Sequence, residues 1–284
     1  MRANAERDGG WPQGGTAFDP AREMPGTKIH PMSYVDPAAE LGEGVEVGAF
    51  AVVEAGARVG DFTSVGHHAV VHGGVSLGAR NQVFPHSVLG GAPQDLKYAG
   101  QPTRLVIGDG NTLREFTTLS RGTEEGGGVT RVGNHNLFMA YTHVAHDCKI
   151  GDHTVLANSA TLAGHCELGS HAVVGGLTGL HQHARIGAFA MVGALSRLSK
   201  DVPPYSMTSG CDEVKVYGLN KVGLRRSGIS RDELDALRSA YRLYQDPLLN
   251  FGEALERLGA LPSKTTHIRA LIDFLKTSER GVYR

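Results

Sequence analysis

The sequence lacks the features that mark several large classes of protein. It contains only 3 cysteines in 284 residues, too few for a disulfide framework, and their spacing fits no zinc motif. No uninterrupted apolar run approaches the roughly 18 residues of a transmembrane helix, so no membrane span is expected. The amino-terminal segment MRANAERDGGWPQGG has no apolar core of the secretory type, which favours the cytoplasm.

Net charge and aromatic content are also low. Lys+Arg number 28 and Asp+Glu number 29, and this balance argues against a nucleic-acid partner, which needs a basic face. Aromatic residues make up 6%, few for a protein that stacks bases. Glycine is abundant instead, with 39 residues, but it does not recur at every third position, which excludes collagen.

What the sequence does contain is a six-residue repeat. Aliphatic residues recur at every sixth position from Ile29 to Leu89, and again from Val132 to Leu198 with Phe138 as the one aromatic member. The position two residues before each of them is restricted as well, mostly to small residues, and on a strand the two side chains share one face. A period of six fits neither an α-helix nor a coiled coil. It predicts short strands joined by turns, which stack as coils of a parallel β-helix.

Glycine often follows the aliphatic position, as at Gly48, Gly66 and Gly151. A chain that turns a corner every six residues needs unusual backbone angles, and glycine adopts them without steric cost. We therefore expect these glycines to be the corner residues with positive φ.

The repeat divides the chain into regions. Residues 1–26 are polar and predict a disordered extension. Residues 27–202 form the predicted β-helix, with loop insertions at 90–104 and 121–131, and insertions into solenoids often lie on the binding face. Residues 203–284 change to a helical period and predict a C-terminal helical domain.

Apolar stripes and one capping signal predict the helices of that domain. Ser230 and Glu233 have the spacing of a capping box at a helix N-terminus. The three apolar stripes are Leu234, Leu237, Tyr241 and Tyr244; Leu255, Leu258 and Leu261; and Ile268, Leu271, Ile272 and Leu275.

The phase of the repeat places several of the 14 histidines on one corner. If three hexads make one coil, then 18 residues return the chain to the same side, and His146, His165 and His181 form a rough column of imidazoles. His143 lies just before this corner. A neutral imidazole here can act as a general base near pH 7. Two other interpretations stay open: solvated corner histidines, and a zinc site made by His143, His146 and His165.

Short motifs in a fixed order give the chain a family resemblance. They are QDLKYAG (94–100), RGT followed by GGG (121–128), HVAHDC (143–148), DVPPY (201–205) and LRRSG (224–228). From about Ile29 to Arg284 the chain resembles the UDP-N-acetylglucosamine O-acyltransferases of lipid A biosynthesis.

The resemblance implies a mainly β fold, a left-handed parallel β-helix of hexapeptide repeats with a C-terminal α-helical domain. It implies a homotrimer with active sites between subunits. The implied reaction moves a 3-hydroxyacyl chain from acyl carrier protein to the 3-position of UDP-N-acetylglucosamine, the first step of lipid A biosynthesis. The donor is the carrier-protein thioester, and no metal or other cofactor is implied.

The resemblance also assigns roles to residues. His146 is the implied general base, Asp147 orients it, and the amide of Gly164 stabilises the oxyanion, with no covalent enzyme intermediate. The implied substrate contacts are Asp95, Lys97, Ser120, His143, His165, His181, Gln182, Ala194, Asn220, Arg225 and Arg226.

Two of these positions, and Val222 beside them, bear on specificity. Ser120 stands where members of the family often have histidine, and a hydroxyl cannot carry charge, which leaves open a 3-hydroxyl or a 3-amino acceptor. Val222 stands where an acidic residue is common near Asn220. Ala194 maps to the floor of the acyl groove, where members that use long chains often have glycine.

Two alternatives to this function remain at this point. One is another hexapeptide-repeat acyltransferase that acts on a nucleotide sugar with acetyl-CoA as donor. The other is a structural or binding β-helix with no catalytic role, for which replacement of His146 would change no activity.

Overall fold

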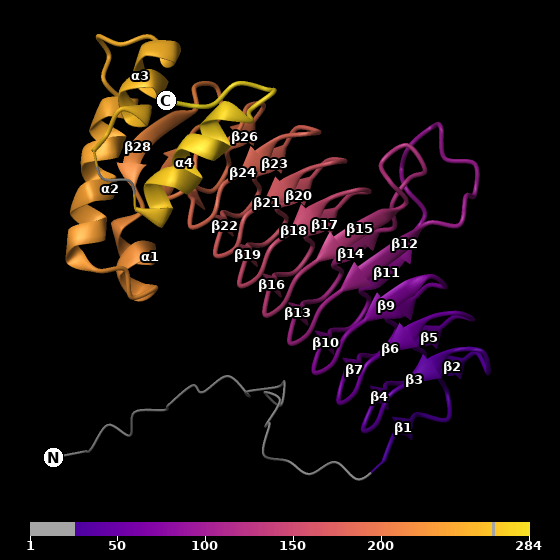
Figure 1. Cartoon of the computed structure of the whole chain (residues 1–284). Coiled ribbons are helices and arrows are strands. Elements are labelled where there is room, and N and C mark those ends of the chain that lie inside the picture. The colour runs from indigo at the N-terminus through magenta and orange to yellow at the C-terminus, as the bar shows by residue number, and fades with distance from the viewer. Residues whose placement is uncertain (1–25, 263–264) are drawn as a thin grey trace, which may run out of the picture.

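The chain turns a corner after almost every strand, so that successive strands join three different sheets. The structure, a computed structural model, describes residues 26–262 and 265–284. The predicted extension over residues 1–26 therefore lies outside the described residues, except for Gly26. Strands pair in parallel with the strand one coil further on; Lys28, for example, is paired with Glu46. The coils stack into a column, and helices cover its C-terminal end (Figure 1).

The three sheets take every third strand in turn until the last coils. The first sheet contains β1 (Lys28–Ile29), β4 (Glu46–Val47), β7 (Ser64–Val65), β10 (Gln82–Val83), β13 (Thr112–Leu113), β16 (Leu137–Phe138), β19 (Val155–Leu156), β22 (Val173–Val174), β25 (Met191–Val192), β27 (Ser206–Ser209) and β28 (Lys215–Leu219). The second contains β2 (Tyr34–Val35), β5 (Val52–Val53), β8 (Val70–Val71), β11 (Val88–Gly91), β14 (Thr118–Ser120), β17 (His143–Val144), β20 (Thr161–Leu162), β23 (Gly179–Leu180) and β26 (Arg197–Leu198). The third contains β3 (Glu40–Leu41), β6 (Arg58–Val59), β9 (Val75–Leu77), β12 (Arg104–Ile107), β15 (Val129–Val132), β18 (Lys149–Ile150), β21 (Glu167–Leu168) and β24 (Arg185–Ile186).

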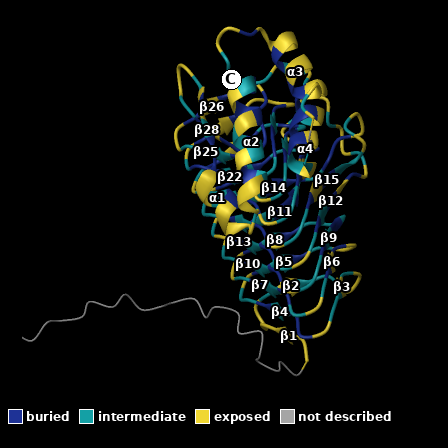
Figure 2. Cartoon of the chain, turned by 60° about the vertical axis from the view of Figure 1, so that its left-hand side comes forward, coloured by how far each residue is buried: buried dark blue, intermediate teal, exposed yellow. Residues whose placement is uncertain are grey.

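The predicted inward positions form the core of the column. Val53, Phe138 and Leu162, at the aliphatic position, are fully buried, and so are Ala51 and Ala160 two residues before that position in their coils. Figure 2 shows the buried positions along the inside of the coils and the exposed ones at the corners. Because each coil covers the next, the hydrophobic core runs the length of the column.

The expected role of the repeat glycines is wrong. Residues with positive φ stand three positions after the aliphatic residue and are often not glycine; Phe50 has φ 59° and His68 has φ 57°. The glycines stand instead where neighbouring coils touch. A Cβ at Gly66 would lie 2.8 Å from the carbonyl oxygen of Val83, and one at Gly151 would lie 2.6 Å from the nitrogen of Ser170. Close stacking, rather than backbone conformation, requires glycine there.

The C-terminal domain consists of α1 (Lys221–Arg226), α2 (Arg231–Tyr244), α3 (Phe251–Gly259) and α4 (Thr266–Lys276). Ser230 caps α2 as predicted, since its hydroxyl accepts a hydrogen bond from the nitrogen of Glu233 at 3.2 Å. The predicted stripes of α2 and α4 are buried, while Leu261 lies beyond the end of α3. No helix in the described part of the chain is long and apolar enough to cross a membrane.

The helical domain is joined firmly to the column. β27 pairs with β25, so the first sheet continues past the predicted boundary at residue 203. The guanidinium of Arg185 donates hydrogen bonds to Asp201 at 2.9 Å and to the carbonyl oxygen of Phe274 in α4 at 3.2 Å. This joint fixes the helices next to the coils that carry the histidines.

Candidate functional site

A histidine and an aspartate form a hydrogen-bonded pair at the corner between β17 and β18. Nδ1 of His146 lies 2.8 Å from Oδ2 of Asp147. Asp147 has the positive φ of the corner position, 60°, which turns its side chain back toward the preceding residue. The Asp147 side chain is 1% exposed and that of His146 is 14% exposed. The carboxylate is therefore shielded from solvent, while the imidazole reaches the surface.

The second loop insertion closes over this aspartate. The nitrogen of Thr123 donates to Oδ1 of Asp147 at 2.9 Å, and its hydroxyl donates to Oδ2 at 2.6 Å. An ionised carboxylate can only accept hydrogen bonds, so Nδ1 of His146 carries the proton that it shares with Asp147. Nε2 is then left with a free lone pair, the form that a general base requires.

Two further imidazoles continue from His146 along the corner. The ring of His165 is perpendicular to that of His146, with centroids 5.1 Å apart, and stacks on His183 at 4.4 Å. The predicted column is thus correct for His146 and His165 but not for His181. His181 is exposed beside Gln182. It stands one residue after the aliphatic position of its coil, whereas the stacked rings of His165 and His183 stand three residues after that position.

These histidines line a groove of about 680 Å³ between the corner and the two loops. It brings together five of the residues predicted from the sequence, namely Asp95, Lys97, His146, His165 and Gln182. Four lining residues were not predicted: Gln94, Leu96, Glu125 and His183.

An ion pair links the two loops across this groove. Nζ of Lys97 lies 2.9 Å from Oε2 of Glu125, and this partner raises the pKa of the Lys97 ammonium. Asp95 stabilises the conformation of the first loop, because its Oδ1 accepts a hydrogen bond from the backbone nitrogen of Lys97 at 3.0 Å. The ammonium of Lys97 is therefore already paired with the carboxylate of Glu125 at the groove.

Burial keeps the neighbouring histidines in their neutral form. His143 lies 2.7 Å from the hydroxyl of Thr118, and burial, followed by the charge of His146, lowers the pKa of its imidazole. Burial also lowers the pKa of His165, although Asp147 opposes the shift. Neutral imidazoles can donate and accept hydrogen bonds at once, which suits them to bind hydroxyl groups.

Gly164 lies directly against the ring of His146. His183 donates its backbone N–H to the carbonyl oxygen of Gly164 at 3.0 Å, and His165 donates to that of His146, also at 3.0 Å. Within the described residues, the N–H of Gly164 itself has no acceptor. It is a free donor next to the imidazole.

The other predicted contacts lie away from the groove of the same chain. Ser120 is buried at the base of the loops, paired with Gly91. Ala194 is exposed on a different corner, between β25 and β26. Arg225 and Arg226 are exposed in the last turn of α1.

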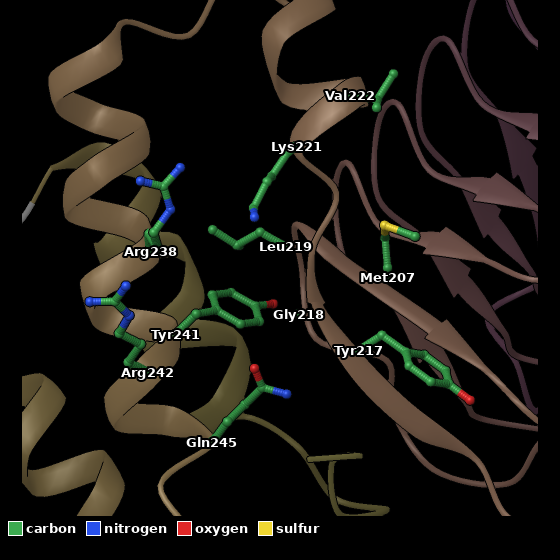
Figure 3. Close-up of a pocket in the computed structure, with 10 residues that line it drawn as sticks. All are labelled: Met207, Tyr217, Gly218, Leu219, Lys221, Val222, Arg238, Tyr241, Arg242 and Gln245. Carbon is green, nitrogen blue, oxygen red and sulfur yellow. The ribbon is translucent and has the colours of Figure 1, made fainter.

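Asn220 has structural partners. As N-cap of α1, its Oδ1 accepts from the nitrogen of Gly223 at 3.0 Å, and its Nδ2 donates to the carbonyl oxygen of Phe189 at 2.9 Å. Next to it, β27, β28, α1 and α2 enclose a second cavity of about 470 Å³ (Figure 3). Val222 lines this cavity together with the cationic side chains of Lys221, Arg238 and Arg242.

The alternative of a metal site also has a geometric basis. His146, Asp147 and His165 each offer one possible ligand atom, and these three atoms all lie within 4.8 Å of one another. His143, which the sequence had suggested as a ligand, is not part of this group. The carboxylate of Asp147 already accepts hydrogen bonds from Thr123 and His146, and these contacts match an acid–base pair better than a ligand to a cation.

Some signals in the sequence could have identified the unpredicted residues. His183 follows His165 by 18 residues, one coil, at the same hexad position. Thr123 belongs to the RGT motif at the start of the second insertion. Its contact with Asp147 depends on how the loop folds back, which no repeat encodes.

Comparisons with known proteins agree with this fold and show the family of the chain. A family described as "Udp N-acetylglucosamine O-acyltransferase; Domain 2" matches residues 201–283, and "Bacterial transferase hexapeptide (six repeats)" matches residues 130–164. The acyl-[acyl-carrier-protein]–UDP-N-acetylglucosamine O-acyltransferase of Halorhodospira halophila is 46% identical over 258 residues, 91% of this chain and 100% of that protein. The enzyme of the same name from Ralstonia nicotianae is 50% identical over 266 residues, 90% and 98% of the two chains.

Solved structures give the same result. The UDP-N-acetylglucosamine acyltransferase from Campylobacter jejuni has a TM-score of 0.85 at 36% identity and covers 90% of this chain and all of its own. The Francisella novicida enzyme has a TM-score of 0.87 at 31% identity, with 90% and 94% of the chains covered. The predicted fold class is thereby confirmed: this is a hexapeptide-repeat acyltransferase. Within that class, the chain belongs to the family of the UDP-N-acetylglucosamine O-acyltransferases.

Proposed function

We propose that this enzyme transfers a 3-hydroxyacyl chain from acyl carrier protein to the 3-hydroxyl of UDP-N-acetylglucosamine, the first step of lipid A biosynthesis. The observation that carries the proposal is the His146–Asp147 pair, whose imidazole opens onto a groove between two loops. The names of the relatives supply the donor and the acceptor, and the groove supplies a base and hydrogen-bonding side chains for them.

In the proposed mechanism His146 acts as the general base. Its Nε2 takes the proton of the sugar hydroxyl while the oxygen attacks the carbonyl carbon of the thioester. Asp147 holds the ring in the required tautomer and stabilises the imidazolium that forms. When the tetrahedral intermediate collapses, the carbon–sulfur bond breaks and the imidazolium returns the proton to the leaving thiolate. The products are an ester and a free carrier thiol.

The intermediate carries a negative charge on the former carbonyl oxygen. The N–H of Gly164 supports this oxyanion in our proposal, because it has no other acceptor among the described residues and lies against the ring of His146. Asp95, Lys97, His143, His165 and Gln182 provide the proposed contacts to the sugar and its diphosphate. No step requires a metal or another cofactor, so we expect full activity after treatment with a chelator.

We propose a homotrimer because several contact residues lie outside the groove. Ala194, Arg225 and Arg226 reach an acyl chain or nucleotide only from a neighbouring copy. The corner that carries Ala194 supports this, since one column of side chains runs along it that is apolar except for His68, His86 and Ser159. Its apolar members are each more than 40% exposed: Met32, Phe50, Phe116, Tyr141, Leu177 and Leu195. Monomers rarely leave so long an apolar surface uncovered.

The central experiment is a product assay with purified enzyme, acyl carrier proteins of several chain lengths, and UDP-N-acetylglucosamine. We expect His146→Ala to fold normally and to lose turnover by roughly 10²-fold or more, the scale of general-base catalysis. His153→Ala, which removes an imidazole from another corner, is the matched control. Near-normal kcat in His146→Ala would contradict the proposed mechanism.

Two further measurements test acceptor and assembly. Mass spectrometry with the 3-amino analogue shows whether Ser120 changes the acceptor; we expect Ser120→His to shift the ratio of amino to hydroxyl use. Mixed oligomers of the His146→Ala and Arg226→Ala variants test whether a site combines residues of two subunits. In such oligomers some sites would take His146 from one subunit and Arg226 from its neighbour, and both residues would be wild type. Recovered activity supports a site between subunits, and a fully active monomer in sedimentation would refute it.

A further inference from the structure

Two of the three hydrogen bonds to the side chain of Asp147 come from one residue of the second loop. Thr123 supplies a donor to each carboxylate oxygen, 2.9 Å from its nitrogen to Oδ1 and 2.6 Å from its hydroxyl to Oδ2. Thr123 is itself buried, at 6% exposure, so water does not compete for these contacts. Oδ2 is also the oxygen that accepts from His146.

The direction of the Thr123 hydroxyl is fixed by a second contact. The nitrogen of Gly126 donates to Oγ1 of Thr123 at 3.1 Å, which occupies a lone pair and leaves the hydroxyl proton for Asp147. Gly126 has to be glycine, because a Cβ there would overlap the carboxyl group of Asp147. The loop thus fits around the carboxylate on two sides.

The backbone of Asp147 is anchored separately. Its nitrogen donates to the hydroxyl of Thr130 in β15 at 2.8 Å. Thr130 places the residue on the corner, and Thr123 then decides how the carboxylate turns. A carboxylate that is free to rotate would share its oxygens with solvent and lose the orientation that selects the His146 tautomer.

We propose that Thr123 is a positioning residue for catalysis, which acts through Asp147 to hold His146 as the base. This inference rests on the proposed function of His146, and it adds a role for the second loop insertion. The loop does more than border the groove, because its Thr123 and Gly126 complete the catalytic pair from a segment that lies outside the hexapeptide repeat.

Kinetic measurements on side-chain variants test the proposal first. We expect Thr123→Val to lower kcat on the order of ten- to a hundredfold, the scale of a hydrogen bond to a charged group, with little change in KM for the UDP-sugar. Thr123→Ser keeps the hydroxyl and should stay within about threefold of wild type. Thr112→Val, on β13 in the first sheet, is the control for loss of a threonine hydroxyl elsewhere. An unchanged kcat in Thr123→Val would overturn the proposal.

A double-mutant cycle separates positioning from a general effect on the loop. If Thr123 acts only through Asp147, then Thr123→Val should cost less than about twofold once Asp147→Asn is already present. Equal losses in both backgrounds would show that Thr123 acts independently of Asp147 and would overturn the proposal.

Nitrogen NMR of ¹⁵N-histidine-labelled enzyme gives a readout that does not need turnover. We expect the His146 signals, assigned with His146→Gln, to show protonated Nδ1 in wild type and a mixture of tautomers in Thr123→Val. The same tautomer in both would contradict the proposal, even for a variant whose folding had suffered. If the wild type does not transfer acyl chains at all, the proposed function fails while the NMR result still tests the contact.

Discussion

Gly164 and His146 lie so close that the glycine has no room for a side chain. A Cβ at residue 164 would be 2.5 Å from Cε1 and 2.8 Å from Nε2 of His146. Real Cβ atoms essentially never approach other atoms this closely, so any substitution must displace the ring. Gly164 therefore restricts where the His146 ring can lie, and it also offers a free amide.

The first prediction follows from this contact. Gly164→Ala should fold, since its φ is ordinary, but should lower kcat about tenfold or more because the imidazole moves away from the sugar hydroxyl. Gly179→Ala is the matched control, because a Cβ at Gly179 meets nothing within 4 Å. If both variants have the same kcat, the close packing on His146 has no catalytic role.

The second prediction concerns the ion pair across the groove. Glu125→Gln removes the anion that holds Lys97, so the ammonium becomes available to the substrate diphosphate, and KM for the UDP-sugar should fall several-fold at low salt. Because the pair is exposed, stability should change little. Glu124→Gln makes the same charge change one residue earlier in the loop. A decrease of equal size in both variants would indicate general electrostatics and not the release of Lys97.

The third prediction is a pH dependence of stability. Burial lowers the pKa of His143 in the folded protein below its ordinary value of 6.5. In the unfolded chain this imidazole takes up a proton near that ordinary value, so the unfolded state binds more protons as the pH falls below about 6.5. The free energy of unfolding should therefore decrease on acidification from pH 7 to pH 5.

Urea unfolding at a series of pH values measures this effect. The decrease should be smaller in His143→Gln, which has no group to titrate at this position. His181→Gln, the replacement of an exposed histidine near the same corner, is the control. Identical slopes in wild type and His143→Gln would show that the buried imidazole is not the cause.

The fourth prediction concerns the acyl chain. Ala194 is exposed on a different corner from the groove-lining loops, where a neighbouring copy would meet it in the proposed trimer. Ala194→Gly should shift preference toward longer hydroxyacyl donors, and a larger residue should shift it toward shorter ones. Each buried CH₂ contributes about 0.8 kcal/mol, so kcat/KM should change several-fold per pair of carbons. An unchanged profile in both variants would show that the groove ends elsewhere.

The repeat made the core of this fold predictable, because one period assigns every inward side chain at once. Phe138 and Leu162 are buried where the period requires, and the stripe of α4 from Ile268 to Leu275 is buried as its helical spacing requires. The glycines were misjudged for a physical reason. A single sequence shows where glycine occurs, but not whether the backbone angle or a neighbouring coil demands it.

The site was predictable only as far as it follows the repeat. The coil length predicts that His146 and His165 share a corner, whereas the stacking of His183 in place of His181 depends on which corner position carries the positive φ. Thr123 reaches Asp147 across 24 positions of sequence through an insertion of irregular shape. Contacts of this kind depend on the folded loop, and no periodicity points to them.

The stacking of coils also determines which part of the column can unfold locally while the corner that carries His146 stays folded. Among the described residues the first coil has one neighbour, and its strand residues Lys28 and Ile29 are exposed, so amide exchange should be fastest there. The corner that carries His146 has several coils on its N-terminal side, and on its C-terminal side lie further coils and α4, which Arg185 of β24 joins to the column. Fraying from the N-terminal coils must therefore remove coil after coil before it reaches His146. Local melting at that end can leave the corner that carries His146 intact.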